Sequence, residues 1–143
     1  MPASHYYQIV EATRELINKS DEFNAEEKTK ILPNGHGHVG DGNLHLNVVL
    51  PGYDDVSLQE RAKNVIEPFV MDYVRKVNGS ISAEHGVGQQ KPAFLHYSKS
   101  HNMIQTMATI KKALDPNHIL NPYKVLPSTT NATDMWKDKI ISV

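Results

Sequence analysis

The spacing of apolar residues predicts three helices along the chain. Between residues 6 and 18, apolar side chains recur every three or four positions, which is the period of a helix with one buried face. Ser4 stands just before this segment and is a residue type that caps helix N-termini. The same period returns from Leu58 to Val77 and from Asn102 to Leu114. Pro68 lies inside the second of these segments, and we expect it to kink that helix.

Turn-forming residues set the ends of these segments. Asn78-Gly79 ends the second predicted helix, and Asp115-Pro116 stops the third, for which Ser100 is the expected cap. Residues 21–30 are rich in charge and are interpreted as a solvated connector. Residues 121–124 are expected to form an extended segment.

Residues 43–50 alternate between apolar and mostly polar side chains, which is typical of a half-buried strand. Successive side chains point to opposite faces of a sheet, so His45 and Asn47 share one face. Leu44, Leu46, Val48 and Leu50 share the other. Residues 80–83 are small and partly apolar, and they predict a short strand that delivers Glu84 to the next turn. Strands separated by helices of this length predict an α+β fold in which helices cover one face of a small sheet.

The length of 143 residues suits one domain with its own core, which we place at residues 1–127. Residues 128–143 are interpreted as a polar tail that ends in a short helix. With 15 basic and 16 acidic residues, the chain carries no charge excess that would predict a nucleic acid or an anionic membrane as its partner. It contains neither a membrane-spanning run nor a targeting segment. The absence of cysteine excludes disulfides and thiolate ligands, and it fits a reducing compartment.

Eight histidines are an unusual number for this length, and two of them stand around a glycine-rich turn. His38 and His45 are seven residues apart with Gly40 and Gly42 between them, so their imidazoles can converge on one metal ion. Glu84 would complete a set of three protein ligands. Three ligands leave coordination positions open, which is the pattern of a catalytic metal, and this donor set suits zinc or a similar divalent ion.

His85 follows Glu84 directly and cannot easily share its ligand direction, which frees its imidazole for proton transfer near neutral pH. It is the candidate general base. His36 could orient a ligand of the site, although the sequence does not require it. Asp41 is either a further carboxylate ligand or a turn residue that bonds its own backbone, and we favour the turn. The remaining histidines are interpreted as surface or hydrogen-bonded residues: His5, His96, His101 and His118.

Three segments together resemble the C-terminal region of the FAD-linked D-2-hydroxyacid dehydrogenases. They are Gly37–Asn47, Ser82–Gly88 and Leu114–Lys124, and they follow one another in the order of that family. The Asn-Pro-Tyr-Lys ending at 121–124, followed by Leu126-Pro127, looks more like the D-2-hydroxyglutarate dehydrogenases of the family than its D-lactate dehydrogenases. The likeness covers roughly residues 1–127. It implies the C-terminal cap domain of these oxidases, in which a small antiparallel sheet is flanked by helices.

The resemblance also implies a reaction, the oxidation of a D-2-hydroxy acid to a 2-oxo acid. A zinc or other divalent ion on His38, His45 and Glu84 would grip the hydroxyl and carboxylate oxygens of the substrate, and His85 would take the hydroxyl proton as hydride passes to FAD. His38, His45, His85 and Asn47 would then line the substrate, or Asn47 would orient a ligand. Asn121 is the residue that the resemblance would place against the flavin.

Members of this family are much longer, because they carry an N-terminal domain that binds FAD and an early cap segment that holds the substrate carboxylates. We therefore expect this chain to be a C-terminal fragment, inactive alone and prone to self-association through faces that such a domain would cover. A non-catalytic module that binds metal or a partner is the alternative, since no hydride acceptor would be present. The resemblance implies a mitochondrial location if the protein is like the eukaryotic members, a cytoplasmic one otherwise, and electron-transfer flavoprotein as the acceptor of the full enzyme.

Overall fold

The computed structural model describes residues 3–52 and 54–127, and the chain divides into two compact units, residues 1–84 and 85–143. The elements of the first unit are η1 (Ala3–His5), α1 (Tyr6–Lys19), α2 (Ala25–Lys30), β1 (Leu32–His36), η2 (Val39–Asp41), β2 (His45–Val49) and α3 (Val56–Lys76). The second unit contains η3 (Pro92–Tyr97) and α4 (His101–Leu114). Among the described residues no helix is long and apolar enough to cross a membrane.

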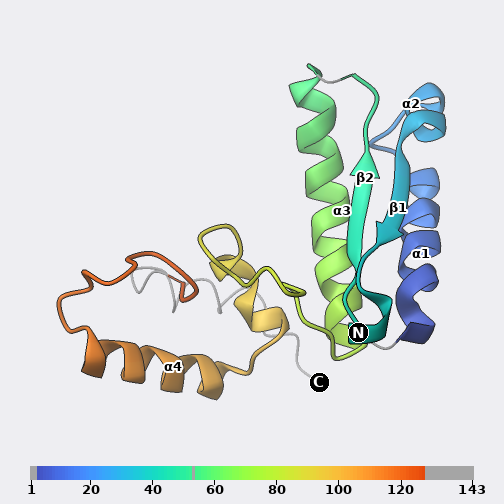
Figure 1. The fold of residues 1–143 in the computed structure, drawn as a ribbon. Helices are drawn as coiled ribbons and strands as arrows, with labels where there is room; N and C mark the ends of the chain where they lie inside the picture. Colours follow the sequence, from blue (N-terminus) through green and yellow to red (C-terminus); the bar gives the residue numbers. More distant parts are fainter. Residues whose placement is uncertain (1–2, 53, 128–143) are drawn as a thin grey trace. The chain divides into compact units, whose positions relative to one another are not determined.

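β1 and β2 form a two-stranded antiparallel sheet, which is the centre of the first unit (Figure 1). Pairing places Asn34 opposite Asn47 and His36 opposite His45. All four of these side chains therefore share one face of the sheet, as alternation predicts for His45 and Asn47. Together with the helices, this sheet confirms the α+β class with a small antiparallel sheet.

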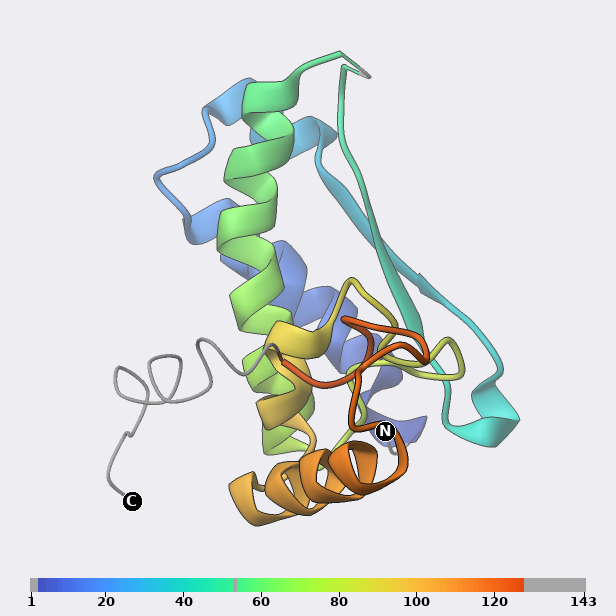
Figure 2. The ribbon, with the colours of Figure 1, turned by 90° about the vertical axis from the view of Figure 1, so that its left-hand side faces the viewer.

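Both long helices of the first unit lie on the same side of the hairpin (Figure 2). The buried face of α1 consists of Ile9, Val10, Thr13 and Ile17, and that of α3 of Leu58, Ala62, Ile66, Met71 and Val74. Ile17 and Leu58 belong to one core cluster, against which Val48 of β2 and Leu50, just after this strand, pack. Burying an aliphatic side chain of this size contributes about 1.5–3 kcal/mol, so the apolar face of the sheet is a main source of stability.

Two expectations about the beginning of the chain are wrong. Ser4 does not cap α1, because η1 precedes this helix and the N-cap position is occupied by His5 without a side-chain cap bond. The charged stretch 21–30 is not simply a connector, because it contains α2. Asn24 and Glu27 form a capping box in which each side chain accepts the backbone N–H of the other, at 2.9 and 2.8 Å.

In the second unit, the helix predicted to end at Leu114 is confirmed as α4, and Ser100 caps it by accepting the N–H of Met103 at 3.3 Å. The segment 121–124 is not extended, since Asn121 and Tyr123 have positive φ angles of 45° and 62°. The buried Asp115 accounts for this path: it accepts the N–H groups of Ile119 and Leu120 at 3.0 and 3.1 Å. The helix predicted near the C-terminus lies outside the described residues.

Candidate metal centre

The loop between β1 and β2 carries His38, and β2 begins with His45. The carbonyl of His38 accepts the N–H groups of Asp41 and Asn43 at 3.0 and 3.2 Å, which closes the loop into a compact turn. Gly42 occupies the left-handed region with φ 75°, a conformation that glycine adopts without steric cost. The hairpin therefore holds the two histidines at the ends of one short, internally bonded loop.

Glu84 reaches the same place from another part of the first unit. Residues 80–83 form bends and the start of a turn, so the predicted strand is wrong. Small polar groups shape this path instead, because the hydroxyls of Ser80 and Ser82 lie 3.1 Å apart and Ser80 also accepts the N–H of Ser82. Ala83 has a φ angle of 45°, which is uncommon for a residue with a side chain and turns the backbone just before Glu84.

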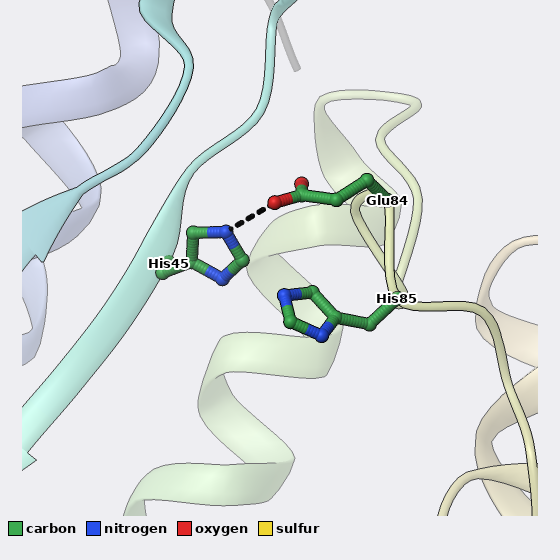
Figure 3. Close-up of side chains that lie close together, drawn as sticks. All are labelled: His45, Glu84 and His85. Carbon is green, nitrogen blue, oxygen red and sulfur yellow. Dashed lines mark hydrogen bonds and ion pairs between the residues drawn. The ribbon is translucent and has the colours of Figure 1, made fainter.

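The two imidazoles converge on one oxygen of Glu84. Nε2 of His45 lies 2.8 Å from Oε1 of Glu84 (Figure 3), and Nδ1 of His38 lies 3.5 Å from the same oxygen. The side chain of His45 is 24% exposed and that of Glu84 is 37% exposed, so the cluster lies at the surface, open to solutes. The sequence predicted this set of three residues, and the structure brings all three together.

The hydrogen bond with His45 holds the pKa of the Glu84 carboxyl below its usual value, and a backbone N–H and the neighbouring imidazoles act in the same direction. The carboxyl group is therefore ionised at neutral pH, as a metal ligand must be. Two imidazole nitrogens and a carboxylate oxygen are a donor set that suits zinc or a related divalent ion. The residues present fit such an ion.

The other residues predicted for this site lie nearby in the sequence or on the same strands. His85 follows Glu84 by one peptide bond, is exposed, and opens the second unit (Figure 3). Its role as a base stays a prediction. Asn47 is exposed on the sheet face that carries His45, and Asp41 is part of the η2 turn, the position that the turn interpretation predicted.

His36 makes a contact with the candidate site that was not predicted from the sequence. Its ring stacks on that of His45, with centroids 5.3 Å apart and planes 30° apart. The stack was not predicted because the strand β1 was not predicted. Pro33 and Gly35 interrupt the alternation of side chains that indicates a strand. Of the remaining histidines, His5 lies at the edge of the Tyr73 ring and His96 lies against Tyr97, as expected of structural residues.

Within the second unit, the other two segments that resemble the dehydrogenases are joined by a backbone bond. The N–H of Val125 donates to the carbonyl of Gly88 at 2.8 Å, which ties the end of the Asn-Pro-Tyr-Lys segment to the glycine turn after His85. Asn121 is exposed in this segment, and its predicted contact with a flavin stays a prediction. The Lys111–Asp115 ion pair anchors the preceding turn.

The chain matches a known protein family over most of its length. Residues 1–125 match the family described as "FAD linked oxidases, C-terminal domain". A rice protein (Oryza sativa subsp. japonica) named "Probable D-2-hydroxyglutarate dehydrogenase, mitochondrial" is 47% identical over 129 residues, which are 90% of this chain and 20% of that protein.

Two further relatives extend the comparison. The Arabidopsis thaliana D-2-hydroxyglutarate dehydrogenase, named as mitochondrial, is 54% identical over 93 residues, 65% of this chain and 16% of its own length. The D-2-hydroxyglutarate–pyruvate transhydrogenase of Saccharomyces cerevisiae is 40% identical over 120 residues, 84% of this chain and 23% of its own. The chain thus spans about a fifth of the length of these relatives. It belongs to the family of FAD-linked oxidases, of which it matches the C-terminal domain.

Proposed function

We propose that this chain is the metal- and substrate-binding part of a FAD-dependent dehydrogenase that oxidises a D-2-hydroxy acid, D-2-hydroxyglutarate in the first place, to its 2-oxo acid. The observation that carries the proposal is the convergence of His38 and His45 on Oε1 of Glu84, at 3.5 and 2.8 Å. The proposal is also supported by the family match and by the relatives, which are named as D-2-hydroxyglutarate dehydrogenases.

Each residue of the site has a defined task in this proposal. His38, His45 and Glu84 would hold a divalent ion, and such an ion would supply a Lewis acid for the substrate hydroxyl. The imidazole of His85 accepts the hydroxyl proton, since an imidazole nitrogen carries a lone pair that can accept it. The carboxamide of Asn47 donates to a carboxylate oxygen of the substrate from the face that His45 shares. A flavin bound by a longer polypeptide of the family would supply the acceptor for the hydride from C2.

The biological setting is part of the same proposal. The relatives are named as mitochondrial enzymes, and we propose the same compartment for the protein to which this chain belongs. Electron-transfer flavoprotein is the proposed acceptor of electrons from the complete enzyme. A non-catalytic metal-binding module is the second candidate, because the chain spans about a fifth of the length of its relatives and the oxidation requires a hydride acceptor.

Zinc titration against a competing chromophoric chelator tests the metal site. We expect His45→Ala and Glu84→Ala to weaken zinc binding at least ~10-fold, because each removes one of three ligands. The matched control is His118→Asn, which removes an exposed histidine at a backbone position with φ 53° that asparagine tolerates. Zinc binding that is equal in all four proteins would refute the ligand assignment.

A dye-reduction assay with D-2-hydroxyglutarate or D-lactate, run with and without added FAD, separates the two candidates. Turnover that favours D-2-hydroxyglutarate supports the dehydrogenase. In an intact enzyme that contains this segment and binds FAD, we expect His85→Ala to abolish turnover while zinc affinity is unchanged. Zinc binding with no turnover under any condition favours the non-catalytic module for the isolated chain.

A further inference from the structure

We propose that His36 is a positioning residue that aims the imidazole of His45 at Glu84, without itself binding the metal. The proposal rests on the metal site described above and adds a residue to its support. Its starting point is the strand register, which places His36 of β1 directly opposite His45 of β2 on the same face of the sheet.

The two rings are in contact as a tilted stack, with centroids 5.3 Å apart and planes 30° apart. Cross-strand partners on one face have Cβ atoms about 4.5–5.5 Å apart, so the backbone itself brings these rings together. Stacked rings restrict each other's rotation about the side-chain bonds. His36 is the more exposed of the two.

The backbone on both sides of His36 lies close to other parts of the first unit. A Cβ atom at Gly37 would lie 2.5 Å from the carbonyl oxygen of Asn43, the neighbour of β2, and φ at this residue is 148°. A Cβ atom at Gly35 would lie 3.0 Å from side-chain atoms of Leu44 and of Val10. Both sequence neighbours of His36, Gly35 and Gly37, are therefore closely packed, and this packing restricts the backbone position of His36.

A metal site with these ligands requires that Nε2 of His45 point toward Glu84. Nε2 of His45 lies 2.8 Å from Oε1 of Glu84, whereas turning the ring out of its present plane about its bond to Cβ would carry that nitrogen away from the carboxylate. Groups that orient a ligating histidine commonly matter ~10–100-fold for metal affinity. In this site the stacked ring of His36 restricts that rotation.

The competing explanation is that His36 is itself a ligand. Phenylalanine distinguishes the two roles, because its ring stacks as histidine does but carries no lone pair. The variants are therefore His36→Ala and His36→Phe, with Asn34→Ala as the control from the same strand and the same face.

The first measurement is zinc affinity of the full 143-residue chain. We expect His36→Ala to weaken zinc binding ~3- to 10-fold, with His36→Phe and Asn34→Ala within about twofold of the unchanged protein. Equal loss in His36→Ala and His36→Phe would overturn the proposal in favour of a lone pair from His36. Full affinity in His36→Ala would overturn it as well.

The second measurement needs no metal, so a failure of the metal site and a failure of this proposal can be told apart. We expect nuclear Overhauser effects between the His45 ring protons and the side chain of Glu84 in the metal-free chain and in His36→Phe, and weaker ones in His36→Ala. Effects of equal strength in all three proteins would show that His36 does not aim the ring, whether or not zinc binds.

Discussion

A single buried carboxylate organises the turn that follows α4. Asp115 is 4% exposed, accepts the N–H groups of Ile119 and Leu120, and forms an ion pair with Lys111. The hydrogen bond from Lys111 is the main reason that the pKa of Asp115 lies below its usual value, and the two backbone N–H groups lower it further. The ammonium of Lys111 also donates to the carbonyl of Leu120 at 2.6 Å, so both partners of the pair hold the same turn.

We therefore expect Asp115→Asn to lower the thermal stability of the second unit at neutral pH. A carboxyl whose pKa is lower in the folded state stabilises the fold above its ordinary pKa of 3.8, and this contribution is lost as the pH falls through the lower, folded-state value. The difference in Tm between the two proteins should thus be full at pH 7 and shrink in acid below pH 3.8, as measured by circular dichroism. A difference that is constant from pH 7 to pH 2 would contradict the role of the charge.

Among the elements, the β1–β2 hairpin depends on a close approach between its strands at the loop. We expect Gly37→Ala to destabilise the chain by about 1–3 kcal/mol, because the new methyl group meets a backbone oxygen and φ is unfavourable for alanine. The control is Gly40→Ala, since an added Cβ at Gly40 meets nothing within 4 Å. Urea unfolding measures both, and equal stability of the two variants would refute this explanation of the hairpin.

The long helices and the alternating strand could be predicted because each carries its own periodic pattern. α1, β2, α3 and α4 all begin and end within about two residues of the expected bounds. β1 and α2 were missed for different reasons. Pro33 and Gly35 interrupt the pattern of β1, which pairs with β2 all the same, whereas α2 has no buried residue and depends on the capping box of Asn24 and Glu27. That box was readable in the sequence.

The candidate metal residues could be predicted from residue type and spacing, but the side-chain contact that supports His45 could not. His38, His45 and Glu84 meet as expected because the hairpin loop is short and closed. The stack of His36 on His45 depends on the register of two strands, and one of these had not been recognised. Long-range pairings of this kind leave little trace in a single sequence.

At the scale of the whole molecule, apolar side chains that are exposed within the described part of the chain bear on its behaviour in solution. Leu114 is 78% exposed, Ile119 72% and Tyr123 82%, and these residues are close in sequence. The apolar side chains of α4 recur at helical spacing, yet Ile104 is the buried residue of this helix, and Met103 and Ile110 are exposed. Exposed apolar surface of this kind favours self-association.

We expect the apparent mass of the chain on a sizing column to rise with protein concentration, and Leu114→Lys to reduce that rise. Gln105→Lys is the control, because it adds the same charge to an exposed position of α4 without removing apolar surface. A monomeric elution volume at every concentration would refute the expectation. An equal effect of both variants would show that net charge, and not the apolar side chain, limits association.

The register of the hairpin has a consequence for how the protein reaches its folded state. If β2 slipped by one residue against β1, His45 would turn toward the core and Leu44 toward the solvent, so the ligands would no longer meet. A metal ion bound by His38, His45 and Glu84 would recognise only one of these register isomers and would populate it at the expense of the others by mass action. The ion would then serve as a template during refolding, and it would correct mispaired hairpins before the helices close over them.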